Sequence, residues 1–385
     1  MQTQTQRMIL WIIFSMSLLF LWDSWQRYNG QPSFFGSTPA TQTQTHAQNP
    51  QAPTPAPATA PADRTIPPSS VPAPAPAAGQ APSGARTAAS SPPIRLANDV
   101  LALDVDPAGG QVRRAELLKY RDVVADDGHN FVLLQDTAST VYLAQSGFVG
   151  APDDASFPTH RTPLAPADGN TAARVLAPGA DSVSLTLTGE SGGLKLERTY
   201  TLERGAYVVQ VHDKITNVSD APLQPTLYMQ LTRDGDAPPG GSRFYSTYTG
   251  PAIYTEADKF QKVSFSDIEK GKAKHTTTAD NGWAGIIEHY FVSAWIPREG
   301  ATREFYTRKV GENLYSVGEK EPLPELAPGA STTVESQLLI GPQDQNMLDS
   351  IAPGLDLTVD YGWLTVVAKP IYWLLEKLHG LVGNW

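Results

Sequence analysis

A period-two alternation of apolar and polar residues begins at residue 94 and restricts the fold more than any other feature of the sequence. It is clearest at residues 194–211, on either side of the turn Glu203-Arg204-Gly205. Successive side chains of a strand point to opposite faces of its sheet, so this stretch predicts a hairpin with one buried face. The apolar positions are Leu194, Leu196, Tyr200, Leu202, Tyr207, Val209 and Val211.

Further short strands are expected along the same region, where clusters of Pro, Gly and Asp separate them and no long amphipathic helix interrupts them. We expect these strands at residues 101–105, 131–134, 141–145, 183–187, 226–231, 286–295, 315–317 and 334–340. With residues 94–342 organised in this way, the predicted architecture is mainly β, a large two-sheet antiparallel sandwich. The chain has no cysteine, so burial alone must hold this domain together.

Residues 31–93 differ sharply from the region that follows them. They are rich in Pro, Ala, Thr, Gln and Ser, and they hold 15 of the 33 prolines. Such a segment cannot bury enough apolar surface to offset the entropy lost on ordering, so we expect a disordered, partly polyproline linker. A proline-rich docking segment is a weaker alternative, because no P-x-x-P register with flanking basic residues is found.

An uncharged apolar run at residues 8–22 predicts a transmembrane helix within an N-terminal anchor at residues 1–30. The run is shorter than a hydrocarbon core of about 30 Å, and flanking arginine and tryptophan residues extend the span to about residues 7–25. A cleaved signal peptide is the alternative, but bulky residues follow the run. The positive-inside rule favours a cytoplasmic amino terminus, with the rest in the periplasm. The anchor residues are Arg7, Met8, Trp11, Phe14, Leu18, Trp22 and Trp25.

The pattern changes to a helical one near the carboxyl end of the sequence. A short helix is expected at residues 344–352 within a connector at 343–360, and an amphipathic helix at 361–385. This second helix is too polar on one face to span a bilayer, so it is predicted to lie in the membrane interface. A helix packed on the sandwich is the alternative. The predicted interfacial residues are Trp363, Val367, Ile371, Trp373, Leu374, Leu375, Leu378 and Leu381.

Charge and motif content restrict the chemistry. The net charge is -10 and no Lys/Arg run occurs, which argues against a nucleic-acid partner. The seven histidines lack the spacing of metal ligands, and neither a G-x-S-x-G motif nor a phosphate loop is present. We therefore predict no catalytic residue, no cofactor and no metal site.

Two segments, residues 281–297 (NGWAGIIEHYFVSAWIP) and residues 355–385, resemble the YidC insertases of Gram-negative bacteria. Residues 281–297 are similar to a G-W-x-x-x-x-x-x-Y-F-x-x-A-W-I-P stretch of the periplasmic domain, and residues 355–385 to the join between that domain, the interfacial helix and the insertase core. Residues 250–268 and the triplet Gln145-Ser146-Gly147 resemble the family more weakly. The signature residues in this chain are Gly282, Trp283, Tyr290, Phe291, Ala294, Trp295, Ile296 and Pro297.

The resemblance implies a galactose-mutarotase-like β-supersandwich and a role in inserting and folding proteins of the bacterial inner membrane. The implied partners are the lipid bilayer, nascent inner-membrane proteins and components of the Sec translocon. Family members continue past Gly383-Asn384-Trp385 into a transmembrane core with an arginine inside the membrane. We therefore expect this chain to be a fragment that lacks that core and does not rescue insertase-depleted cells by itself.

A membrane-anchored periplasmic carbohydrate-binding or mutarotase-like protein is the alternative from another class, and a purely structural spacer is a third. Proton transfer on a sugar would need candidates such as His212, His275, Glu288 and His289. Glu288 and His289 are neighbours in an expected strand, where they would point to opposite faces, so we interpret all four as structural or solvated. The aromatic residues Trp283, Tyr290, Phe291 and Trp295 are expected to fill the core and not to line a cleft.

Overall fold

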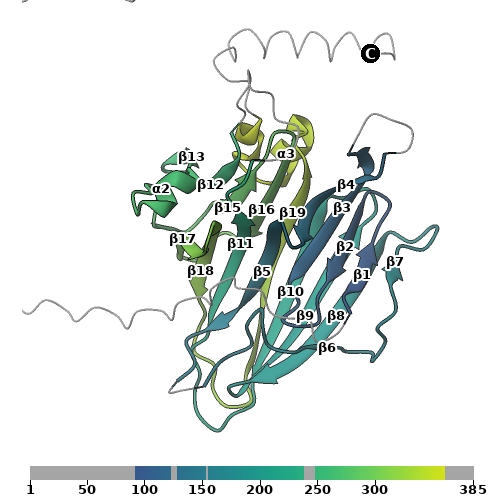
Figure 1. Cartoon of the computed structure of the whole chain (residues 1–385). Helices are drawn as coiled ribbons and strands as arrows, with labels where there is room; N and C mark the ends of the chain where they lie inside the picture. Colours follow the sequence, from purple (N-terminus) through teal and green to yellow (C-terminus); the bar gives the residue numbers. More distant parts are fainter. Residues whose placement is uncertain (1–91, 123–127, 153–154, 238–247, 360–385) are drawn as a thin grey trace, which may run out of the picture. The chain divides into compact units, whose positions relative to one another are not determined.

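The computed structural model describes residues 92–122, 128–152, 155–237 and 248–359 (Figure 1). The predicted anchor, residues 31–91 of the predicted linker and the predicted interfacial helix lie outside these residues. None of the helices within the described ranges has the length and apolar character that a membrane span requires.

Ten strands form the first sheet, in the spatial order β14-β17-β18-β11-β5-β4-β3-β2-β1-β7. Its neighbouring strands are antiparallel, except that β7 runs parallel to β1. The strands are β1 Ile94–Ala97, β2 Leu101–Val105, β3 Val112–Arg121, β4 Asn130–Asp136, β5 Val141–Val149, β7 Arg174–Val175, β11 Thr226–Asp234, β14 Thr278–Ala279, β17 Arg303–Gly311 and β18 Leu314–Pro322.

Nine strands form the second sheet, which is antiparallel throughout, in the order β13-β12-β15-β16-β19-β10-β9-β8-β6. The neighbouring strands β9 and β10 form the predicted hairpin, with Leu202 opposite Val209 and Leu194 opposite Asn217, so that prediction is confirmed. The strands are β6 Ala165–Pro166, β8 Ser182–Ser191, β9 Leu194–Glu203, β10 Val208–Asn217, β12 Gly250–Thr255, β13 Lys259–Lys262, β15 Trp283–Ile287, β16 Phe291–Pro297 and β19 Ser331–Pro342.

The main core lies between the two sheets and takes apolar side chains from both of them. Alternate residues of β9 enter it, and the burial pattern of this strand is strictly periodic. Leu194, Leu196 and Leu202 of β9 meet Leu103, Leu227 and Leu231 of the other sheet in one cluster. The period-two pattern therefore arises because one face of the strand is buried and the other is partly exposed to water. The prediction of a mainly β, two-sheet sandwich is confirmed.

A second hydrophobic core, the outer core, covers the outer face of the nine-stranded sheet at one end and includes Trp283, Leu339 and Leu348. Helix α3 (Gln345–Ile351) and the short 3-10 helix η1 (Leu355–Thr358) pack there against β12, β15, β16 and β19 (Figure 1). Asp344 caps α3 by accepting a hydrogen bond from the Met347 backbone, which confirms the short helix predicted here. Three of these strands, β12, β15 and β16, are buried on both faces. Helix α2 (Phe265–Glu269) lies in the connection that follows β13.

One predicted strand is wrong. Residues 286–295 are not a single strand, because the chain turns at Glu288-His289-Tyr290 between β15 and β16. Both strands have two buried faces and are apolar at almost every position, so no change of parity marks the turn.

Candidate functional site: the signature hairpin and its surroundings

The hairpin β15–β16 carries the signature residues and is held from both sides. Trp283 lies in the outer core, where its Nε1 donates to the Pro353 carbonyl at 3.1 Å and its ring stacks on Tyr254 at 6.0 Å. Trp295 points the opposite way into the main core, and its Nε1 donates to the Gln230 carbonyl at 3.1 Å. The two tryptophans thus fix the hairpin between the ten-stranded sheet and the helical cap, α3 with η1.

The other signature residues are mostly explained by packing. Phe291 stacks on Phe131 with 4.3 Å between ring centroids, at the edge of the main core. Gly282 has a positive φ of 99°, and a Cβ there would lie 1.9 Å from the Tyr254 carbonyl oxygen, so only glycine fits. Six of the eight signature residues are buried, namely Trp283, Phe291, Ala294, Trp295, Ile296 and Pro297.

Glu288 occupies the turn and is buried in an ion pair with Arg233 of β11. The Arg233 Nε lies 3.0 Å from the Glu288 Oε1, and the Arg233 Nη1 also donates to the carbonyls of Asp234 and Asp236. Burial raises the pKa of Glu288, and the neighbouring guanidinium of Arg233 opposes this shift. The pair ties the β15–β16 turn to the end of β11, so Glu288 is a structural residue.

Tyr290 departs from the prediction that it fills the core, because its side chain projects from the turn and is 68% exposed. The imidazole of His289 packs edge-on against its ring, with the centroids 3.9 Å apart. Period-two reasoning placed both residues inside a strand and could not show that they lie in a turn.

The four candidates for sugar chemistry have different surroundings. His212 lies on β10, with its Nδ1 3.6 Å from the Glu335 carboxylate on β19. His275 contacts the Thr307 hydroxyl of β17 at 3.1 Å. Glu288 and His289 lie in the β15–β16 turn, so their predicted placement in a strand is wrong. Among the described residues, no three His, Asp or Glu side chains are grouped closely enough to hold a metal ion.

A buried ladder of polar side chains crosses the ten-stranded sheet, and sequence reasoning missed it. Leu227, Met229 and Leu231 of β11 enter the main core, so Gln230 and Thr232 point to the opposite, outer face. Both are fully buried there, and each donates a hydrogen bond to the Oε1 of Gln145 on β5, at 2.8 Å from Gln230 and 3.0 Å from Thr232. The ladder continues through Gln111 and Ser316, and Tyr306 and Arg308 also donate to Gln230. Period-two alternation predicts that the polar residues of a strand face solvent, so it does not predict a buried polar network of this kind.

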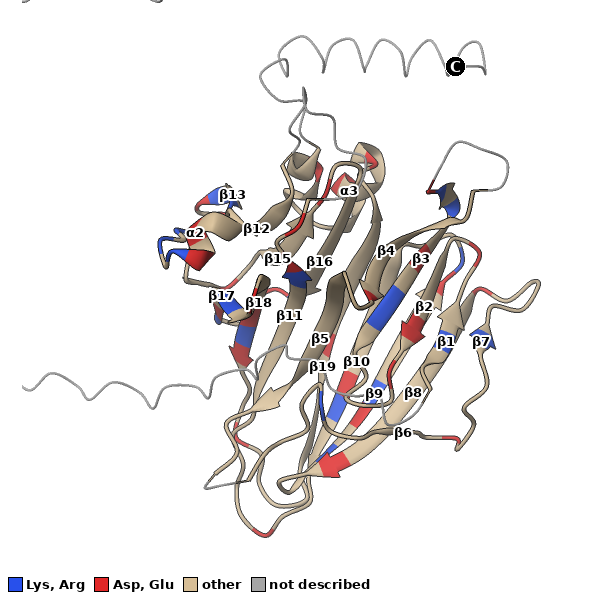
Figure 2. Cartoon of the chain, in the orientation of Figure 1, with Lys and Arg blue, Asp and Glu red and all other residues tan. Residues whose placement is uncertain are grey.

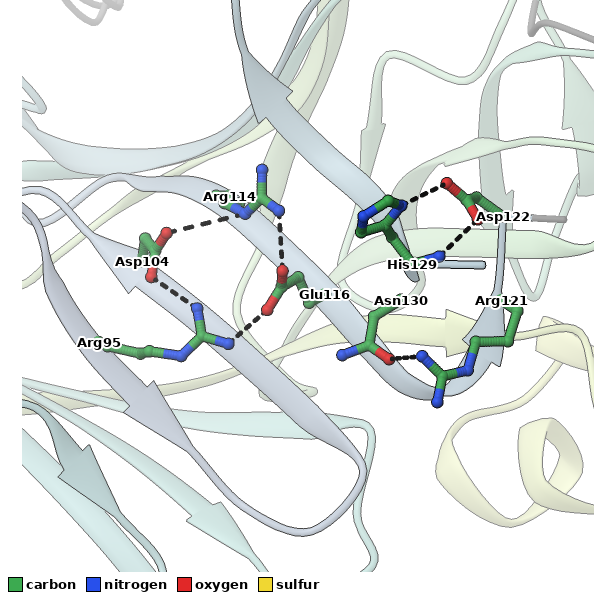
Figure 3. A network of polar contacts seen from close by, with 8 residues as sticks. All are labelled: Arg95, Asp104, Arg114, Glu116, Arg121, Asp122, His129 and Asn130. Atoms are coloured by element: carbon green, nitrogen blue, oxygen red, sulfur yellow. Dashed lines mark hydrogen bonds and ion pairs between the residues drawn. The ribbon is translucent and has the colours of Figure 1, made fainter. Parts of the chain in front are cut away.

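Figure 2 shows basic and acidic residues interspersed along the strands of the described chain. A ring on β1, β2 and β3 joins Arg95, Asp104, Arg114 and Glu116 (Figure 3). Burial raises the pKa of Glu116, but hydrogen bonds from Arg114 and Arg95 outweigh this effect and leave that pKa below its ordinary value. Two arginines balance two carboxylates in this ring, unlike the basic face that phosphate binding requires.

Together, the sandwich, the clamped hairpin and the helical cap define a large two-sheet β-domain followed by a short helical segment. The family model of the YidC periplasmic domain matches residues 93–374. The chain is 48% identical over 380 residues to the membrane protein insertase YidC of Bordetella pertussis, covering 99% of this chain and 66% of that one. It is 46% identical over 385 residues to the YidC of Cupriavidus taiwanensis, covering 99% and 65%. The chain therefore belongs to the YidC family.

The chain spans about two-thirds of the length of these relatives, 66% and 65% respectively. Solved structures match it only distantly. A galactose mutarotase related enzyme from Lactobacillus acidophilus gives a TM-score of 0.42 at 9% identity, over 65% of this chain and 97% of that one. A putative aldose 1-epimerase from Escherichia coli K12 gives 0.35 at 13% identity, over 65% and 98%. Similarity of this degree does not transfer an activity.

Proposed function

We propose that this chain acts as part of a membrane protein insertase and chaperone that assists the insertion and folding of inner-membrane proteins, alone or with the Sec translocon. The observation that carries the proposal is the match of 99% of the chain to relatives named membrane protein insertase. Its partners are the lipid bilayer, nascent inner-membrane proteins and Sec components, and its site of action is the bacterial inner membrane.

The parts of the chain take separate roles in this proposal. Residues 1–30 anchor the protein, residues 31–93 form a flexible linker, and residues 94–342 form a periplasmic supersandwich of the galactose-mutarotase-like type. The connector at 343–360 leads to an interfacial helix at 361–385. The family model for the periplasmic domain covers the sandwich and supports its place on that side of the membrane.

The chain works in this scheme without covalent chemistry or a cofactor. The buried carboxylate of the signature hairpin, Glu288, is held by Arg233, and the conspicuous aromatic residues Trp283 and Trp295 are used for packing. These contacts support a domain that acts by position and binding.

Depletion of the protein in its host tests the function directly. The gene that encodes this chain is placed under a repressible promoter, and newly made inner-membrane proteins are followed by pulse labelling and protease protection. We expect their insertion to fall on depletion and to recover when the complete natural gene, and not only the part for residues 1–385, is supplied from a plasmid. Unchanged insertion after complete depletion would refute the proposal.

A further inference from the structure

The β15–β16 turn presents an aromatic residue that the packing of the domain does not use. At 68%, Tyr290 is more exposed than the other exposed large apolar residues of the described chain, which are Val175, Val218 and Leu357. It also lies within the signature segment, where six neighbours are buried. Packing within the described domain therefore does not account for this ring.

The turn that carries Tyr290 is rigid. The Glu288 backbone N–H donates to the Phe291 carbonyl at 2.9 Å, and the Gln343 backbone donates to the Tyr290 carbonyl at 2.8 Å. The Gln343 side chain donates to the Glu288 and Phe291 carbonyls at 2.8 and 3.1 Å, and the Glu288 carboxylate is bound to Arg233. An aromatic ring on a backbone fixed in this way loses little entropy when it binds a surface.

The position of the turn indicates which surface it meets. Gln343 joins the turn to α3, which begins two residues later and is seven residues long, or about 10 Å. η1 follows, and the described chain ends at Val359, which packs on the outer core. The turn is thus hydrogen-bonded to the segment that continues through α3 and η1 towards residues 361–385. Figure 1 shows β15, β16 and α3 at the same end of the sandwich.

We propose that the exposed ring of Tyr290, with His289 against it, inserts into the headgroup region of the lipid bilayer and holds this end of the sandwich at the membrane surface. The inference rests on the proposed function, because it takes residues 361–385 to be an interfacial helix. Tyrosine suits this region, since its ring is apolar and its hydroxyl remains hydrated among the headgroups. The charge of Glu288 is compensated by Arg233, so the turn adds no unpaired carboxylate that anionic lipids would repel.

A spin label tests the proposal, because the chain has no cysteine of its own and each engineered one is unique. The full chain with Tyr290→Cys is labelled with a nitroxide and reconstituted in vesicles of phosphatidylethanolamine and phosphatidylglycerol. Collision rates with oxygen, which concentrates in the bilayer, and with a water-soluble nickel chelate are then measured. His289→Cys places the same label beside an intact Tyr290.

Val218→Cys is the matched control, because Val218 is an exposed apolar residue that follows the last residue of β10. The β15–β16 turn lies near the other end of β10, where Tyr207 bonds to β19 close to Gln343. Ten residues of strand separate the two ends, which is about 30 Å. We expect the oxygen-to-nickel ratio at positions 289 and 290 to exceed that at position 218 by roughly twofold or more.

Equal ratios at the three positions would overturn the proposal. Low collision rates with both reagents at position 290 would also overturn it, because they would show that a protein surface covers the turn. A failure here leaves the depletion result unaffected, so it is distinguishable from a failure of the proposed function.

Discussion

Arg198 and Asp213 form a bidentate ion pair inside the sandwich, with both hydrogen bonds at 2.6 Å and the two side chains 0% and 4% exposed. Removal of the carboxylate would leave a buried guanidinium without its counter-charge. We therefore expect Asp213→Ala to lower the free energy of unfolding by about 3–5 kcal/mol, measured by urea denaturation.

A neighbouring pair provides the control for this prediction. Glu197 and Lys214 lie 3.4 Å apart on the same two strands, but their side chains are 34% and 56% exposed. An exposed pair of this kind contributes little, so Glu197→Ala is expected to cost less than about 1 kcal/mol. Equal losses for the two variants would show that burial does not determine the strength of these pairs.

Glu319 and Glu321 share one counter-charge, the buried Arg303, at 4.0 and 3.7 Å. One guanidinium balances one carboxylate, and burial raises the pKa of Glu319 well above its ordinary value and raises that of Glu321 as well. The folded state then keeps a proton that the unfolded state has already released. The stabilisation that comes from this retained proton is therefore fully present below the ordinary carboxyl pKa. It is lost as the pH rises through the pKa that Glu319 has in the folded protein.

Glu319→Gln tests this linkage, because glutamine has a similar shape and does not ionise. We expect its free energy of unfolding to decline less than that of the unchanged chain between about pH 5 and about pH 8. The measurement is a series of urea unfolding curves across this range. Parallel pH profiles would mean that Glu319 ionises freely in the folded protein.

At the scale of the element, the start of β15 depends on a glycine. Gly282 and Gly300 have nearly the same φ, 99° and 96°, but only Gly282 lies close to other atoms. Gly282→Ala meets the Tyr254 carbonyl, whereas Gly300→Ala meets nothing within 4 Å. Both variants bear the cost of a positive φ, about 1 kcal/mol, so the additional loss of stability in Gly282→Ala isolates the clash. Equal unfolding midpoints for the two variants would contradict this account.

The helical cap is held mainly by a few buried side chains. Leu348 of α3 is fully buried in the outer core, whereas Leu357 of η1 is 39% exposed. Leu348→Ala is expected to cost about 2–5 kcal/mol and to make residues 343–359 more sensitive to limited proteolysis. Leu357→Ala is the control and is expected to leave the cleavage rate nearly unchanged. A similar cleavage rate in both variants would show that the cap is not attached through Leu348.

At the scale of the whole molecule, the proposed topology places the sandwich in the periplasm and the amino terminus in the cytoplasm. Two single-cysteine variants, Val218→Cys and Gln2→Cys, report which side of the membrane each position faces, and Val218 is 46% exposed. A membrane-impermeant maleimide is expected to label position 218 in cells whose outer membrane alone is permeabilised, and position 2 only after lysis. Labelling of position 2 before lysis and of position 218 only after it would show that the topology is the reverse of the proposed one.

The family membership and the mainly β architecture were both accessible from the sequence. The β9–β10 hairpin was predicted from alternation, because each of its strands has one buried and one solvated face. The signature at residues 281–297 indicated the family, and the family model confirms it. Local patterns of this kind depend on neighbours along the chain, and a sequence records those directly.

Only the tertiary structure decided how the hairpin β15–β16 is held. Its strands are buried on both faces, so alternation did not reveal the turn, the exposure of Tyr290 or the separate cores of Trp283 and Trp295. The Arg233–Glu288 pair joins residues 55 positions apart, and the polar ladder of Gln145 and Gln230 joins residues 85 apart. Such partners are chosen by the pairing and stacking of sheets, which no local pattern of residues specifies.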